Sequence, residues 1–289
     1  MRILIAIDGS PQAKAVLSLG AYLAQSGLAG QPPVLLTVAR HDRDRAQAEC
    51  HLTDARQRLS LNGVEGKVRV GRPDYEILLE AQEPGYDMLL IGEGWRPRRF
   101  LARAPERLTA ARVAERAPCP VLAVLGGGRF PGPERPIRRI LLCDSGARSS
   151  LNAVGSEAPP VRRFVARLAE WLGGEEEVTV LHVMSQLSAG PGVRGRQLRA
   201  GVDELVAGHT PEGQLIEQDV RVLDRPGLHP QAKVRHGLVV DEILSEARSG
   251  DYDLVIIGAH QENGWQRFLL DDLAHQILLH VDRNVLVVH

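Results

Sequence analysis

The segment EILLEAQEPGYDMLLIG, residues 76–92, recurs 166 residues later as EILSEARSGDYDLVIIG, residues 242–258. Each copy leads through the pair Tyr-Asp into an aliphatic run that ends in glycine. The preceding sequence agrees as well, because RILIAIDGS from Arg2 resembles RILLCDSGA from Arg139. Self-similarity of this kind predicts two copies of one fold in tandem.

The length of the chain and the position of a Gly- and Pro-rich segment support this division. A chain of 289 residues favours two domains, at roughly 150 residues per domain. Gly and Pro crowd the stretch GGGRFPGPERP, residues 126–136, where neither a helix nor a central strand can continue. We therefore expect a first domain at residues 1–128, a linker at 129–136 and a second domain at 137–289. The first 130 residues carry 18 basic and 14 acidic side chains and the remainder 17 and 22, so the halves differ in net charge.

Each copy alternates short aliphatic runs with segments of helical periodicity. The strands expected in the first copy are residues 3–7, 34–38, 66–70, 88–91 and 121–124. Those expected in the second copy are residues 140–143, 178–183, 220–223, 254–257 and 285–288. Apolar spacing near 3.6 predicts helices at residues 75–82 and 108–115. Strands separated by helices pair in parallel, so the sequence predicts an α/β fold of two doubly wound five-stranded parallel sheets, Rossmann-like in class.

Composition excludes several classes of protein. An apolar fraction of 44% with 25% charged residues is typical of soluble globular domains. A net charge of -1 offers no basic field for a nucleic acid partner, and no apolar run reaches the roughly 20 residues of a membrane span. Three cysteines without C-x-x-C spacing predict neither disulfides nor a zinc ribbon, and a reducing, cytoplasmic setting fits best. No metal-ligand or nucleophile motif occurs, so we expect no catalytic residue and no metal.

Ligands of open parallel sheets bind beyond the carboxyl ends of the strands, near the point where strand order reverses. An aspartate directly after the first strand can accept hydrogen bonds from a nucleoside, and a glycine after a later strand lets the backbone approach phosphate. Turn formation and close packing account for such residues equally well. The candidate ligand residues are Asp8, Ser10, Val38, Gly92 and Gly94 in the first copy and Asp144, Val183 and Gly258 in the second.

Three motifs resemble the universal stress protein family, in its tandem form. They are the strand followed by Asp-Gly-Ser at residues 8–10, the Y-D-x-x-x-I-G that ends at Gly92 and again at Gly258, and A-P-C-P-V-L at residues 117–122. The resemblance covers nearly the whole chain. It implies domains like those of the adenine nucleotide alpha hydrolases, pairing of domains across an edge strand, and a stress-related function in the cytoplasm.

Some members of that family bind ATP through G-x2-G-x9-G-[ST], and the second copy departs from this motif. Gly258 is followed by Ala-His-Gln, and the closing pair falls on Asp271 and Asp272. One unfavourable charge pair at roughly 4 Å costs on the order of 1 to 4 kcal/mol, depending on screening. We therefore expect a degenerate second site that does not bind ATP in the family manner.

The first copy also departs from the motif. Its second glycine, Gly94, comes one position early, and the closing pair falls near Arg107. Guanidinium groups bind phosphate well, and the connecting segment holds Arg96, Arg98, Arg99, Arg103 and Arg107. This copy is either a solvated basic loop or an anion site that takes ATP or another adenine nucleotide.

Three functions remain in order of preference. The first is a non-enzymatic stress-response module for binding or regulation, with degenerate ATP motifs. The second is a stress protein that binds an adenine nucleotide in its first domain, and the third is a slow ATPase. Edge strands of the two domains can pair within one chain, and a homodimer or a protein partner is also compatible with the sequence.

Overall fold

The computed structural model describes residues 1–10, 12–25, 31–59, 61–93, 109–125, 137–143, 164–165, 167–168, 175–184, 200–258 and 266–288. The chain forms two compact units. Unit 1 comprises Met1–Pro136 with Asp282–Val287, and unit 2 comprises Ile137–Val281 with Val288–His289. The predicted linker at 129–136 lies outside the described residues.

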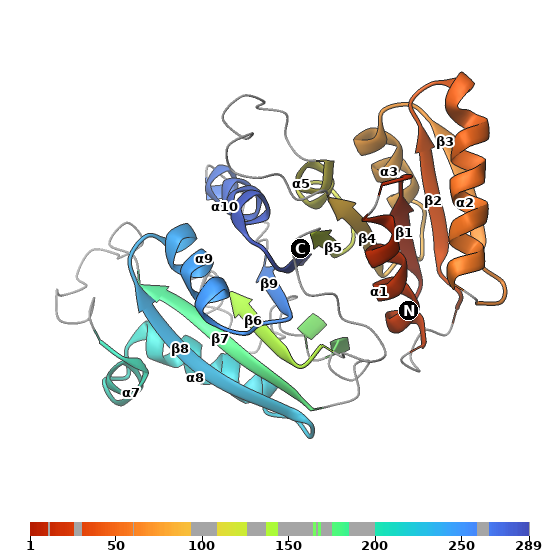
Figure 1. Cartoon of the computed structure of the whole chain (residues 1–289). Coiled ribbons are helices and arrows are strands. Elements are labelled where there is room, and N and C mark those ends of the chain that lie inside the picture. Colours follow the sequence, from red (N-terminus) through yellow and green to blue (C-terminus); the bar gives the residue numbers. More distant parts are fainter. Residues whose placement is uncertain are drawn as a thin grey trace. The chain divides into compact units, whose positions relative to one another are not determined.

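Unit 1 is a parallel sheet with helices between its strands (Figure 1). The strand order is β3-β2-β1-β4-β5, so the order reverses between β1 and β4. The strands are β1 (Ile3–Ile7), β2 (Val34–Ala39), β3 (Glu65–Val70), β4 (Met88–Glu93) and β5 (Val121–Leu125). The helical elements are α1 (Ala13–Gln25), the 3-10 turn η1 (Asp42–Asp44), α2 (Arg45–Leu59), α3 (Pro73–Ala81) and α5 (Thr109–Ala114).

The helices of unit 1 cover both faces of its sheet. Close packing at Gly20 sets α1 against Ile5 of β1, and close packing at Gly66 sets β3 against Leu52 of α2. Alternate residues of a strand point to opposite faces, so Lys67 faces the other side, where it contacts α3. The doubly wound class predicted from the sequence is therefore confirmed for this unit.

Strand β10 (Asn284–Val288) completes the sheet of unit 1. It runs antiparallel to β5, with Val285 opposite Ala123 and Val287 opposite Val121. The side-chain oxygen of Asn284 also accepts a hydrogen bond from the Leu125 amide at 3.3 Å. The final strand of the second sequence copy thus pairs with the final strand of the first.

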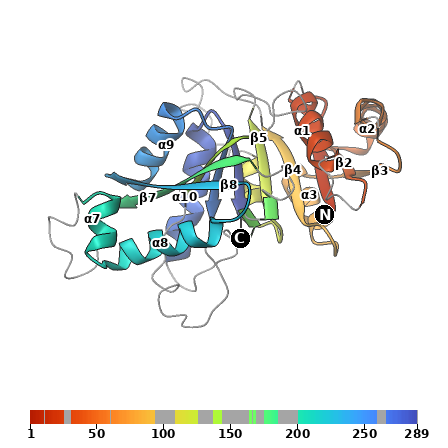
Figure 2. The same cartoon turned by 90° about the horizontal axis from the view of Figure 1, so that it is seen from below.

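Unit 2 holds four parallel strands in the order β9-β6-β7-β8. They are β6 (Arg139–Cys143), β7 (Glu176–Met184), β8 (Leu228–His236) and β9 (Leu254–Gly258). The helices are α7 (Val202–Ala207), α8 (Pro211–Leu223), α9 (Val239–Ser249) and α10 (Gln266–His280). Figure 2 shows α7 and α8 following one another beside β7 and β8.

One predicted strand is wrong. Residues 220–223 form the last turn of α8 rather than a strand. Thr210 caps this helix by accepting a hydrogen bond from the Gly213 amide at 3.0 Å, and Pro211 occupies its first turn. These start signals outweigh the β-branched character of Val220 and Val222. The strand that pairs with β7 is β8, whose alternating polar residues hide its strand character.

Aliphatic side chains from the strands fill the core of each unit. The strands β1, β5, β9 and β10 are buried along their whole length. The continuous aliphatic runs of β1, β5 and β9 are typical of parallel strands covered by helices on both faces. Among the described residues, no helix is long and apolar enough to span a membrane.

Candidate functional site

The carboxyl ends of β1, β2 and β4 lie side by side in unit 1. Strand β1 pairs with both neighbours, with Ile7 opposite Thr37 and Ala6 opposite Ile91. This register brings four predicted residues to one edge of the sheet: Asp8, Ser10, Val38 and Gly92. We call these positions, together with Gly9, the strand-end edge of unit 1.

Local contacts already occupy several groups at this edge. Asp8 is exposed, and its Oδ1 atom accepts a hydrogen bond from the Ser10 amide at 3.1 Å. The carbonyl of Ser10 in turn accepts from the Ala13 amide at 3.1 Å, which starts α1. A Cβ atom on Gly92 would lie 2.8 Å from Cγ2 of Val16, so glycine permits α1 to pack on the end of β4. These contacts show structural roles, and ligand binding by these residues stays a prediction.

The remaining predicted residues divide by where they lie. Gly94, Arg107 and Asp144 lie outside the described residues, as do the side chains of Asp271 and Asp272. The backbone of the last two belongs to α10. In unit 2, Val183 is half-buried opposite Arg235, and Gly258 ends β9. Val38 is likewise opposite Arg69 in unit 1, so the two valines occupy equivalent positions.

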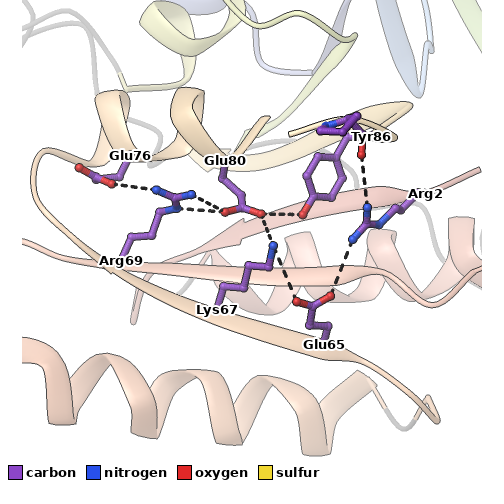
Figure 3. Close-up of polar contacts among 8 residues, drawn as sticks. Arg2, Glu65, Lys67, Arg69, Glu76, Glu80 and Tyr86 are labelled. Atoms are coloured by element: carbon purple, nitrogen blue, oxygen red, sulfur yellow. Dashed lines mark hydrogen bonds and ion pairs between the residues drawn. The ribbon is translucent and has the colours of Figure 1, made fainter. Parts of the chain in front are cut away.

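A buried carboxylate lies between the sheet of unit 1 and α3. The Glu80 side chain is 1% exposed. Its Oε1 atom lies 2.6 Å from Nζ of Lys67 and 2.8 Å from the hydroxyl of Tyr86, and its Oε2 atom lies 2.9 Å from Nη2 of Arg69 (Figure 3). Arg69 also reaches Glu76 at 3.5 Å. Two cationic side chains of β3 thus form ion pairs with carboxylates on one face of α3.

Unit 2 contains the same cluster, with every residue displaced by 166 positions. Glu246 is 1% exposed and accepts hydrogen bonds at 2.8 Å from Lys233, Arg235 and Tyr252. Arg235 also reaches Glu242 at 2.8 Å. We call each set the Lys-Arg-Glu-Tyr cluster of its unit.

The clusters shift the pKa values of their members. Burial by itself would raise the pKa of Glu80, but hydrogen bonds from Lys67, Tyr86 and Arg69 outweigh it and hold that pKa below its ordinary value. The pKa of Glu246 is lowered in the same way. Burial is the main cause that raises the pKa of Tyr252, with the hydrogen bond to Glu246 adding to it, to about 12. The carboxylates therefore stay charged and the phenols neutral near pH 7.

An aspartate beside each cluster fixes the start of a central strand. Oδ2 of Asp87 accepts a hydrogen bond from the Arg2 amide at 2.7 Å. Oδ2 of Asp253 accepts from the amides of Arg138 and Arg139 at 3.0 and 3.1 Å. The Tyr-Asp pair that stands in both copies is therefore part of the scaffold.

Sequence reasoning missed the clusters, although a signal for them was present. Residues 67–69 and 233–235 both read Lys-Val-Arg, and they are separated by the same 166 positions as the longer repeat. Spacing of two places both cations on one face of a strand. A comparison of the copies upstream of residue 76 would have revealed the cationic half and the strand β8.

The described residues offer little for catalysis. The buried glutamates are ion-paired with cations on the same scaffold. No group of three or more His, Cys, Asp or Glu residues within the described part of the chain could hold a metal ion.

Comparisons with known proteins give the family. The family model described as the Universal stress protein family matches residues 1–124 and 137–289. A universal stress protein from Archaeoglobus fulgidus is 15% identical, with 99% of this chain and 95% of that chain covered and a TM-score of 0.64. A protein of unknown function from Pseudomonas aeruginosa is 17% identical, with 99% and 92% covered and a TM-score of 0.62.

Shorter structures also match. A universal stress protein from Archaeoglobus fulgidus in complex with dAMP is 26% identical, with 43% of this chain and 96% of that chain covered and a TM-score of 0.33. No curated protein matches the chain. Two matches of one family model together span most of the sequence, and the chain belongs to the universal stress protein family.

Proposed function

We propose that this chain is a non-enzymatic stress-response module for binding or regulation, whose two copies share a scaffold and differ in their ligand edges. The strongest support is that the two copies share their buried structural residues but differ in sequence where a phosphate loop would lie. Both Lys-Arg-Glu-Tyr clusters and both Tyr-Asp pairs are kept. The sequences diverge directly after Gly92 and Gly258, where a phosphate loop would begin.

The backbone of α10 argues against ATP binding in the second copy. A helix leaves only its first four N–H groups free, and phosphate is held by such free groups. Helix α10 begins at Gln266, so Asp271 and Asp272 fall in its second turn. Their amides lie within the helical hydrogen-bond ladder, and their carboxylates would repel a triphosphate.

In the first copy, the strand-end edge lies where a nucleotide is expected to bind, but its Asp8 and Gly92 already make contacts within the protein. The Asp8 carboxylate already accepts a hydrogen bond from the Ser10 amide, and Gly92 packs on Val16. We propose that the intact chain does not bind ATP in the manner of G-x2-G-x9-G-[ST].

Isothermal titration of the full chain with ATP, ADP and AMP in the presence of Mg²⁺ tests this proposal. We expect no saturable heat at millimolar ligand. Saturable binding at one site per chain would instead support the adenine-nucleotide stress protein, and nucleotide released from the purified protein by gentle denaturation would do the same. Phosphate release above the buffer rate would support the slow ATPase.

A further inference from the structure

The imidazole of His51 lies directly against the backbone of Gly9 at the strand-end edge of unit 1. A Cβ atom on Gly9 would overlap the ring and would lie 2.9 Å from its Nδ1 atom. Real Cβ atoms do not approach other atoms so closely, so any larger residue at position 9 would require the His51 ring to move. The ring fills the space that adjoins the β1–α1 connection.

The packing of α2 holds the ring in this place. Ala48, Leu52 and Ala55 are buried, and Leu52 contacts β3 at Gly66. His51 precedes Leu52 and is half-buried, so its side chain is directed toward β1 rather than β3. The position of the ring is therefore a consequence of how the whole helix docks on the sheet.

A buried hydroxyl lies on the same face of the sheet. Thr37 is opposite Ile7 in the β1–β2 register, and neighbouring residues in register point to the same face. Its side chain is 2% exposed, and its Oγ1 atom has no hydrogen-bond partner among the described residues. A buried hydroxyl without a protein partner calls for one from elsewhere, such as a water molecule or an ion.

From this geometry we infer that the His51 side chain restricts which ligands bind at the strand-end edge of unit 1, because it fills the space beside Gly9 that a nucleoside would need. This inference rests on the proposed function, because it explains why unit 1 does not take an adenine nucleotide. Ligands of a doubly wound sheet lie beyond the carboxyl ends of the strands, and the ring lies there against Gly9, the residue that follows Asp8. Replacing it with a small side chain opens the edge to nucleosides and nucleoside monophosphates.

The test is binding of AMP and adenosine to the full chain and to His51→Ala, measured by isothermal titration. We expect no saturable heat from the unchanged chain and saturable AMP binding by His51→Ala, with an affinity at least about tenfold above the weakest that the titration detects, which corresponds to about 1.4 kcal/mol. Cys50→Ala is the matched control, because Cys50 precedes His51 on α2 and is exposed. It should leave binding unchanged.

The outcomes separate the two proposals. Saturable ATP binding by the unchanged chain overturns the proposed function. No saturable binding by the unchanged chain together with none by a folded His51→Ala overturns the role of His51 and leaves the proposed function intact. His51→Ser serves in its place should the alanine variant not fold.

A double-mutant comparison tests the contact itself. Gly9→Ala should lower the urea midpoint of the unchanged chain, because the added methyl group overlaps the ring. In a His51→Ala background the same change should have a much smaller effect. In the unchanged chain, a nuclear Overhauser contact between the His51 ring and the Gly9 α-protons is expected, and its absence overturns the inference without any variant.

Discussion

Glu80 and Glu246 are charged groups buried to 1% exposure, each compensated by two cations and a phenol. Glu80→Gln keeps the shape but removes the charge, so Lys67 and Arg69 lose their counter-ion. Removing one partner of a fully buried pair costs 3–5 kcal/mol, and the cations here are about 30% exposed. We expect a loss of about 2–3 kcal/mol in the free energy of unfolding, measured by urea denaturation.

Glu83 supplies the matched control for this prediction. It lies one turn from Glu80 and is exposed, so Glu83→Gln should change stability by less than about 0.5 kcal/mol. Glu246→Gln should repeat the effect of Glu80→Gln in unit 2. Equal, small losses for Glu80→Gln and Glu83→Gln would show that the cluster does not stabilise the fold.

Thr37 is the opposite case, a buried polar group whose removal should help. Its hydroxyl is without a hydrogen-bond partner among the described residues, and an unsatisfied polar group costs about 1–3 kcal/mol. Thr37→Val replaces the hydroxyl with a methyl group. We expect stability between unchanged and about 1 kcal/mol higher, seen as a higher urea midpoint. A clear loss of stability would mean that the Thr37 hydroxyl makes a stabilising hydrogen bond.

At the scale of elements, the turns that lead from the edge strands into α3 and α9 depend on glycine. Gly71 has φ +152° and Gly237 has φ +150°, and a Cβ on either would lie 2.7 Å from Oε1 of Glu76 or Glu242. Alanine would strain the backbone and push away a partner of the cluster arginine. We expect Gly71→Ala to cost about 1–3 kcal/mol in urea denaturation.

Gly201 provides the comparison for the turn glycines. It has φ −78°, and no atom lies within 4 Å of a Cβ built on it. Gly201→Ala should therefore cost less than about 1 kcal/mol, which is the difference between glycine and alanine at a helix N-cap. A similar cost at both positions would remove strain as the explanation.

Most of the strands could be predicted from sequence because they contain continuous aliphatic runs. The exception is β8, where Lys233 and Arg235 face inward to Glu246. Inward charges on an edge strand discourage pairing with another chain, and they also erase the hydrophobic pattern by which strands are found. Strand β3 carries the same two inward cations and is predicted correctly, so the charges alone do not explain the failure. In unit 2 the more aliphatic residues 220–223 lie shortly upstream and are predicted as the strand instead.

The candidate site could be predicted only in part. Asp8 and Gly92 are recognisable because they follow strands directly, and the β1–β2 and β1–β4 pairing brings their strands together. The contact of His51 with Gly9 depends on how α2 docks across 42 positions of sequence. No local pattern encodes such a contact, so sequence alone did not single out His51.

At the scale of the whole molecule, the two clusters set the pH range of stability. The pKa values of Glu80 and Glu246 are lowered on folding. Their contribution is complete above the unfolded pKa of about 4.3 for Glu and is lost as pH falls through the folded values. The pKa values of Tyr86 and Tyr252 are raised, so their contribution is complete below about pH 10 and is lost above it.

We therefore expect a stability plateau from about pH 5 to about pH 10, falling on both sides. Urea denaturation at a series of pH values measures it. Glu80→Gln combined with Glu246→Gln should reduce the fall on the acid side, because glutamine does not titrate. A steep loss of stability between pH 8 and pH 6 would contradict this account and would point to histidine.

Strand β10 makes unit 1 depend on the far end of the sequence. Its residues Val285 and Leu286 are fully buried, and the strand covers the edge of β5. Deleting residues 282–289 uncovers an aliphatic strand whose N–H and C=O groups then lack partners, which favours pairing with a second chain. We expect the truncated protein to show a larger mass than the full chain by light scattering at equal concentration, whereas removal of His289 alone should change nothing.

Because β5 is aliphatic throughout, its exposed edge has no inward charge to prevent this pairing, unlike β3. A truncated chain of unchanged mass and unchanged urea midpoint would mean that β10 does not protect the edge.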